Sequence, residues 1–220
     1  MEEYIQRYNE AVFDTDRAMA RQVVQDAIAA GVTPEDVVFR IVVPAIDNMM
    51  SLLKAPQGVN LAQHFMASQI AAEVTDEMVA RFSVPPRMIG RMVIGAAAGD
   101  FHGLGKRIVA GCLKARMIDV IDLGLNVSAE RFVEQALEQG ASVIGISSMM
   151  VHTARGDNGS RGVRRLLREK GLEDRIKVVV GGAPYRYDPE LYHAVEADAW
   201  ADNALEAGVV VTRLMEGQPS

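Results

Sequence analysis

Two residues with the chemistry of a metal site stand close together in this chain. They are Asp100 and His102, in the glycine-rich stretch Gly99–Lys106. Imidazole is the commonest metal ligand among side chains, and a carboxylate on its second nitrogen fixes the tautomer and raises the basicity of the ring. The same triplet also occurs in solvated loops, where the aspartate caps a helix or braces a turn. The role of the pair therefore depends on the elements that hold it.

The stretch is predicted to be a loop between a strand and a helix. The apolar run Met92–Ala96 is typical of a buried parallel strand, and apolar residues recur at helical spacing from Lys106 to Arg116. In an α/β sheet such loops lie at the carboxyl ends of the strands, where ligands bind. The pattern thus places the pair where a ligand site is expected.

Short apolar runs alternate with helical patterns over the rest of the chain. This alternation predicts an α/β fold, a flavodoxin-like doubly wound parallel sheet of five strands in a Rossmann-like domain over residues 87–220. The expected strands are 92–96, 119–123, 142–146, 177–180 and 197–200. The expected helices are 106–116, a helix capped by Ser128 that ends at Gln139, a basic helix to about Lys170 after a loop at 155–159, a helix from Asp188, and a last helix capped by Asp202.

Residues 1–86 predict an N-terminal helical bundle followed by a linker. Helices are expected at 2–13, from the Asp14–Asp16 caps to Ala30, from the Thr33 cap to about Leu53 with a bend at Pro44, and from the Asn60 cap to Phe82. Loop residues are expected at 55–58, and Ser83–Pro86 is typical of a linker.

Composition excludes several classes of function. The 220 residues carry a net charge of −6, which argues against nucleic-acid binding through a basic surface. A single cysteine, Cys112, excludes an internal disulfide and a cysteine metal cluster. Neither a signal peptide nor a membrane-spanning run is recognised, so a soluble, cytoplasmic protein that does not bind membranes is expected.

Small residues follow two more of the predicted strands. Ser147 and Met149 come after the third strand, and Gly181-Gly182 after the fourth. Taken alone, the serine suits a helix cap and the glycines a tight turn. Together with the Asp100–His102 loop they predict a slot for an elongated group at the carboxyl edge of the sheet.

The spaced set Asp100-x-His102-x-x-Gly105, Ser147-x-Met149 and Gly181-Gly182 resembles the cobalamin-binding domain shared by methionine synthase, adenosylcobalamin mutases and corrinoid methyl-carrier proteins. Val120–Gly124 and Val180–Pro184 are similar to the methyl-carrier branch. The helical residues before the linker resemble the four-helix cap domain of methionine synthase and of methyl carriers.

The resemblance implies a cobalamin or related corrinoid as cofactor, with His102 as the lower axial ligand of its cobalt in place of the cofactor's own base. It implies catalytic roles for Asp100, which holds the imidazole, and Thr153, which extends the relay. Gly103 stands where the family commonly has an aspartate. A bulky side chain at Gly182 is expected to block the nucleotide slot without unfolding the domain. The implied cofactor-binding residues are Asp100, Phe101, His102, Gly103, Leu104, Gly105, Ser147, Met149, Thr153, Gly181, Gly182 and Ala183.

The implied function is to shuttle a methyl group between a substrate:corrinoid methyltransferase and a corrinoid:folate or corrinoid:thiol methyltransferase, as a subunit rather than a complete enzyme. A reductive activation protein is a further implied partner. Three alternatives stay open: the small subunit of an adenosylcobalamin mutase, which is expected to lack the helical part; a cobalamin-dependent sensor, which is expected to carry an output segment; and a flavodoxin-like domain without a corrinoid, which a colourless purified protein would indicate.

Overall fold

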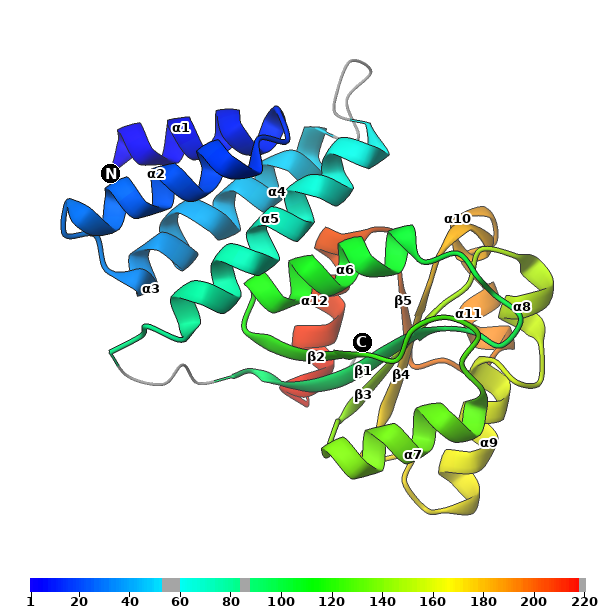
Figure 1. Cartoon of the computed structure of the whole chain (residues 1–220). Helices are drawn as coiled ribbons and strands as arrows, with labels where there is room; N and C mark the ends of the chain where they lie inside the picture. The colour runs from blue at the N-terminus through cyan, green and yellow to red at the C-terminus, as the bar shows by residue number, and fades with distance from the viewer. Residues whose placement is uncertain (53–59, 84–87, 218–220) are drawn as a thin grey trace. The chain divides into compact units, whose positions relative to one another are not determined.

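The computed structural model describes residues 1–52, 60–83 and 88–217 (Figure 1). They form two compact units, one of residues 1–87 with 114–116, the other of residues 88–113 and 117–220. The loop predicted at 55–58 and the linker residues 84–86 lie outside the described residues. No helix in the described ranges is both long enough and apolar enough to cross a bilayer.

The first unit is built from helices, as the sequence predicts. They are α1 (Glu2–Phe13), α2 (Arg17–Ala29), α3 (Pro34–Asp36), the π-helical turn η1 (Val37–Val42), α4 (Val43–Leu52) and α5 (Leu61–Val79). The predicted caps begin them: Asp16 accepts the Met19 N–H at 2.9 Å, and Asn60 and Gln63 form a reciprocal capping box at the start of α5. Each main helix turns a small apolar face inward, with Val12, Val23 and Ile70 among the buried side chains.

The π turn lies directly before Pro44, where the sequence predicts a bend. Proline has no N–H, and its ring displaces the carbonyl four residues earlier. The helix responds by widening for one turn, in which the Val43 N–H donates to the carbonyl of Val38, five residues back. The structure therefore accommodates the proline by a change of hydrogen-bond register rather than by ending the helix.

The second unit is a parallel five-stranded sheet in the order β2-β1-β3-β4-β5, which confirms the predicted fold class. The strands are β1 (Gly90–Ala96), β2 (Ile118–Asp122), β3 (Val143–Ser147), β4 (Lys177–Gly181) and β5 (Ala199–Ala201). The order reverses between β1 and β3, so the loops after these strands diverge there and leave the place where α/β sheets bind ligands.

Helices cover both faces of this sheet (Figure 1). One core packs around Val93, Ile144 and Phe132, with α7 (Ala129–Gln139), α9 (Ser160–Glu169) and α11 (Leu191–Ala194) on that face. The other packs around Met92, Leu113 and Val211, with α6 (Leu104–Ala115) and α12 (Ala204–Met215). Two short helices, α8 (Val151–Arg155) and α10 (Ala183–Tyr187), follow β3 and β4 directly.

Several predicted boundaries were wrong. The helix α6 begins at Leu104, so Gly105 lies in its first turn rather than in the loop. Asn203, not Asp202, caps the last helix, because its side chain accepts the Glu206 N–H at 3.0 Å. The helix expected from Asp188 is only the short α11. Neither α8 nor α10 was predicted, because five residues are too few to show the i, i+3, i+4, i+7 pattern of apolar residues.

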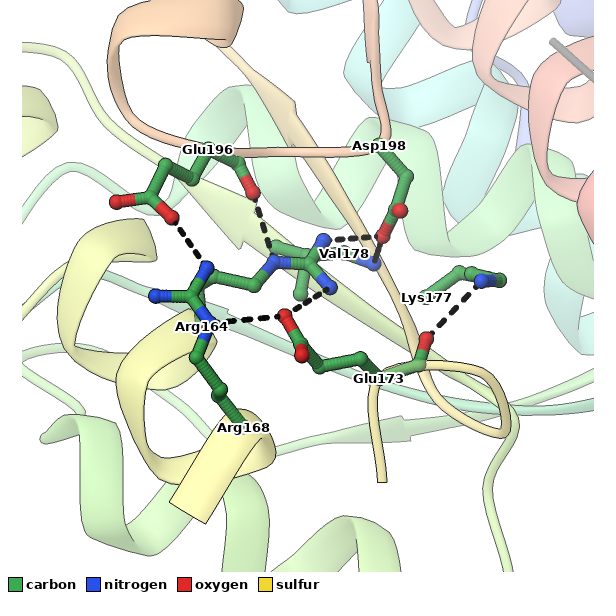
Figure 2. Close-up of polar contacts among 7 residues, drawn as sticks. All are labelled: Arg164, Arg168, Glu173, Lys177, Val178, Glu196 and Asp198. Carbon is green, nitrogen blue, oxygen red and sulfur yellow. Dashed lines mark hydrogen bonds and ion pairs between the residues drawn. The ribbon is translucent and has the colours of Figure 1, made fainter. Parts of the chain in front are cut away.

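A buried arginine fastens the amino end of the sheet (Figure 2). The Arg164 guanidinium on α9 donates to the Glu196 carbonyl at 2.9 Å and to the Asp198 carboxylate at 2.5 Å. Asp198 precedes β5, and its carboxylate also accepts the Val178 N–H of β4 at 2.6 Å, while its own N–H donates to the Val178 carbonyl. Glu196 in turn pairs with Arg168 at 2.7 Å. The network therefore holds α9, β4 and the start of the edge strand β5 together.

Candidate functional site

The Asp100 carboxylate is the centre of the polar contacts at the carboxyl end of the sheet. Its side chain is 1% exposed. Oδ1 lies 3.0 Å from the His102 backbone nitrogen and 2.9 Å from His102 Nδ1. Oδ2 accepts from the Met149 N–H at 2.6 Å and from the Thr153 hydroxyl at 2.8 Å. A single carboxylate thus ties the loop after β1 to the loop and helix after β3.

These contacts determine the protonation state of the Asp100 side chain. Burial alone would raise the pKa of Asp100, but the hydrogen bonds donated by Met149, His102 and Thr153 outweigh it and hold the pKa at about 2. The carboxylate is therefore ionised near neutral pH. Because an ionised carboxylate only accepts hydrogen bonds, Nδ1 is the nitrogen of His102 that donates to it, and in the neutral imidazole the lone pair is then on Nε2.

The imidazole of His102 is open to a ligand. Its side chain is 58% exposed, and nothing in the described part of the chain bonds Nε2. The described residues hold no group of three or more His, Cys, Asp or Glu that could bind a bare metal ion. One imidazole does not make a metal centre, so a metal at His102 must arrive with its remaining ligands in a prosthetic group.

Thr153, on α8, is buried and has two acceptors within reach. Its hydroxyl lies 2.8 Å from Asp100 Oδ2 and 2.8 Å from the Met150 carbonyl. A hydroxyl has one proton, so it donates to one of the two at a time. The structure thus brings all three predicted polar residues, Asp100, His102 and Thr153, into one chain of contacts.

A row of small residues crosses the sheet at the same level. In register, Ala96 pairs with Ser147, Ser147 with Gly181, and Gly181 with Ala201. Neighbours in register share a face, and this row continues the side of the sheet that carries α6 and α12. None of the four has a side chain larger than that of serine, and Gly105 of α6 has no atom within 4 Å of where a Cβ would stand. The row leaves room for a narrow group laid across the strand ends. The sequence predicted such a slot beside Ser147 and Gly181.

Gly182 has a different role from the predicted one. Its φ is +115°, a backbone conformation that side chains rarely allow, and a Cβ there would lie 2.0 Å from the Ser148 carbonyl oxygen. The expectation that a bulky side chain at Gly182 leaves the domain folded is therefore wrong. Gly182 lets the chain turn against the loop after β3 and leads into Ala183, the first residue of α10.

Large apolar side chains are exposed around His102. The predicted residues Phe101, Leu104 and Met149 are among them, with Phe101 67% exposed. Three more, Leu125, Met150 and Val151, were not predicted, and all lie in loops or helix starts after β2 and β3. The only sequence feature that could have indicated these three residues is their hydrophobicity next to the end of a strand. An apolar surface with one ionisable ligand in it fits a broad, flat, metal-carrying ring.

Residues 90–209 match the family model described as the B12 binding domain. The chain belongs to the B12-binding family. Its cofactor is therefore a cobalamin or related corrinoid, in which the corrin ring supplies the ligands that the side chains lack. This membership agrees with the exposed imidazole, the buried acid behind it and the row of small residues.

Curated relatives of this B12-binding protein extend over nearly all of it. The chain is 31% identical to the trimethylamine corrinoid protein of Methanosarcina barkeri, over 94% of each. It is 33% identical to dimethylamine corrinoid protein 2 of Methanosarcina mazei, over 84% of this chain and 78% of the relative. The similarity thus includes the helical unit.

Solved structures share the fold. The methanol:cobalamin methyltransferase complex MtaBC of Methanosarcina barkeri matches with a TM-score of 0.77 at 22% identity, covering 99% of this chain and 81% of the matched chain. A cobalamin-binding protein of Desulfitobacterium hafniense matches with a TM-score of 0.73 at 20% identity, covering 95% and 97%. At these identities the likeness establishes the fold.

Proposed function

We propose that this B12-binding protein is a methyl carrier that moves a methyl group from a substrate-specific methyltransferase to a second methyltransferase with a folate or thiol acceptor. The observation that carries the proposal is the exposed Nε2 of His102, backed by an ionised, buried Asp100. The near-complete match to proteins named as corrinoid proteins of methylamines supports it. That match includes the helical unit, and so favours a carrier over an adenosylcobalamin mutase subunit.

In this proposal His102 would hold the cobalt of the corrinoid through Nε2. When bound, the corrinoid supplies the cobalt that receives and gives up the methyl group. Asp100 holds the proton on Nδ1 and so keeps Nε2 ready to bind. If Nε2 were to take a proton while no metal is bound to it, the Asp100 carboxylate would stabilise the imidazolium. Thr153 adjusts to either state by turning its hydroxyl between Asp100 and the Met150 carbonyl.

The other residues would seat the corrinoid. The row through Ser147 and Gly181 would accept its nucleotide tail, and Phe101 and Met149 would contact its ring. Gly103, Leu104, Gly105, Gly182 and Ala183 shape the loops and helix starts between them. We propose residues 1–86 as a helical cap domain and residues 87–220 as the corrinoid-binding domain.

The partner enzymes would provide the substrate sites. The relatives carry the names of two amines and the matched complex that of methanol, so we assign the choice of methyl donor to the partner methyltransferase rather than to the corrinoid site. A reductive activation protein would restore the cofactor after oxidation.

The ligand assignment is tested by electron paramagnetic resonance of the cobalt(II) form. In the loaded wild type grown with ¹⁵N-labelled histidine, a histidine ligand should split each cobalt line in two, whereas the ¹⁴N of the cofactor's own base would split it in three. His102→Ala should abolish the two-line splitting. His193→Ala is the matched control and should keep it, because this exposed histidine of α11 pairs with Glu190 and lies against the Tyr192 ring, away from the Asp100 contacts. Two-line ¹⁵N splitting that persists in His102→Ala, or that is absent from the labelled wild type, would contradict the assignment.

A further inference from the structure

The loop after β2, residues 122–127, lies against the histidine loop, and the proposed function gives it no role. Asn126 is its central residue. The Asn126 side-chain oxygen accepts the Gly99 N–H at 2.8 Å, and the Asn126 N–H donates to the Asp100 carbonyl at 3.0 Å. One residue therefore holds the backbone on both sides of the peptide that joins Gly99 to Asp100.

The backbone of this loop has a conformation that suits it to that task. Asn126 has a φ of +53°, in the left-handed region that asparagine adopts more readily than most residues. Gly124 has a φ of +89°, and its N–H donates to the Asp122 carboxylate at 2.8 Å. The Gly124 carbonyl and the Val127 N–H then bond the backbone of Ala96, at the end of β1. The loop is thus fixed to the same strand from which the histidine loop departs.

Two side-chain contacts join the loop to the other end of the histidine loop. The ammonium group of Lys106, buried in the first turns of α6, pairs with the Asp122 carboxylate. Leu125 lies over Gly103, where a Cβ would stand 3.0 Å from the leucine Cδ2. A side chain at residue 103 would therefore press on Leu125 and shift it by a few tenths of an ångström. The loop therefore contacts residues before, beside and after His102.

We propose that Asn126 is a positioning residue for the cobalt ligand. By fixing the backbone at Gly99 and Asp100, it keeps the Asp100 carboxylate on Nδ1 of His102, so that Nε2 is presented in one orientation. A ligand that leaves and rejoins the metal in each cycle gains from such a fixed support, because less freedom is lost when it binds. This inference rests on the proposed role of His102.

Two substitutions separate the side-chain contact from the backbone conformation. Asn126→Gly removes the oxygen that accepts the Gly99 N–H but tolerates the positive φ. Asn126→Asp keeps both an acceptor and a residue type that tolerates this conformation. The first measurement needs no cofactor: hydrogen exchange of the Gly99 amide, followed by NMR in the protein without corrinoid, should quicken in Asn126→Gly and stay near wild type in Asn126→Asp.

The second measurement is made on the corrinoid-loaded protein in the cobalt(II) form. Asn126→Gly should retain its corrinoid, while the ratio of histidine-bound to histidine-free cobalt falls by about threefold to tenfold, the factor that loss of one hydrogen bond carries. Asn126→Asp should restore the ratio. A ratio in Asn126→Gly equal to that of the wild type would overturn the inference while leaving His102 as ligand. Two-line ¹⁵N-histidine splitting that survives His102→Ala would instead overturn the role of His102 on which the inference rests.

Discussion

Replacing Asp100 by asparagine should cost stability in an amount that depends on pH. In the wild type both carboxylate oxygens accept hydrogen bonds, so the asparagine NH₂ must face donors on one side. If it faces His102, it meets the His102 N–H and forces the ring proton onto Nε2. If it faces Thr153, the hydroxyl accepts from it and donates to the Met150 carbonyl instead. The second orientation leaves only the Met149 N–H without an acceptor, so we expect it.

The magnitude follows from these contacts. A buried N–H without a partner costs about 1–3 kcal/mol. The lowered pKa gives a comparable figure: a shift from 3.8 to about 2 corresponds to about 2 kcal/mol of preference for the ionised form in the folded chain. Because the folded pKa is depressed, this stabilisation is complete above the unfolded pKa of 3.8 and is lost as the pH falls towards 2. Asparagine has no such dependence.

The assay is urea unfolding of the corrinoid-free protein, followed by fluorescence of Trp200, the single tryptophan, which lies on β5. Asp100→Asn should be less stable than wild type by about 1–3 kcal/mol at neutral pH. The difference should narrow by about 1 kcal/mol by pH 3. Asp174→Asn, at an exposed aspartate, is the control and should match the wild type throughout. A difference of the same size at pH 7 and pH 3 would refute the reasoning.

Two further substitutions test the frame around the site by the same unfolding assay. Gly182→Ala should lower the free energy of unfolding by at least about 2 kcal/mol, because it adds strain at a φ of +115° and a close contact with the Ser148 carbonyl. The control, Gly105→Ala, should change the free energy of unfolding by less than about 1 kcal/mol. Equal stabilities of the two variants would show that the loop after β3 moves to accommodate the added methyl group without cost. Arg164→Met should cost about 2–4 kcal/mol, because it leaves the Asp198 carboxylate without its buried partner, whereas Arg165→Met, at an exposed neighbour, should cost less than about 0.5 kcal/mol. If Arg164→Met leaves the free energy of unfolding unchanged, the network does not hold β5.

The sheet was the most predictable part of the molecule. Its strands are buried on both faces, so each appears in the sequence as an apolar run, and the alternation with helices dictates parallel pairing. The predicted strands differ from the observed ones by at most two residues at either end. The short helices α8 and α10 could not be predicted, because each has too few residues to show the helical spacing of apolar side chains.

The candidate site was predictable where it depends on neighbours in sequence. Asp100 and His102 are two residues apart, so a contact between them could be expected from spacing alone. The Met149 N–H on the same carboxylate could not, because it depends on how the loops after β1 and β3 meet. The contacts of Asn126 could not be predicted for the same reason. Asn126 bonds the backbone of another loop, and the residue types of that loop do not indicate which side chain bonds its backbone.

The Arg164 network and the Asp100 carboxylate lie at opposite ends of the same sheet, the first on β4 and β5 and the second after β1 and β3. The polar contacts at the two ends have no side chain in common. A substitution at one end therefore does not remove a contact at the other. The amino end secures the sheet whatever molecule is bound, and the carboxyl end is free to carry glycines, short side chains and exposed apolar groups that add little cohesion. A lineage built on this plan could vary its corrinoid or its partner by substitutions at the carboxyl edge alone, with the folded state already secured about a strand's length away.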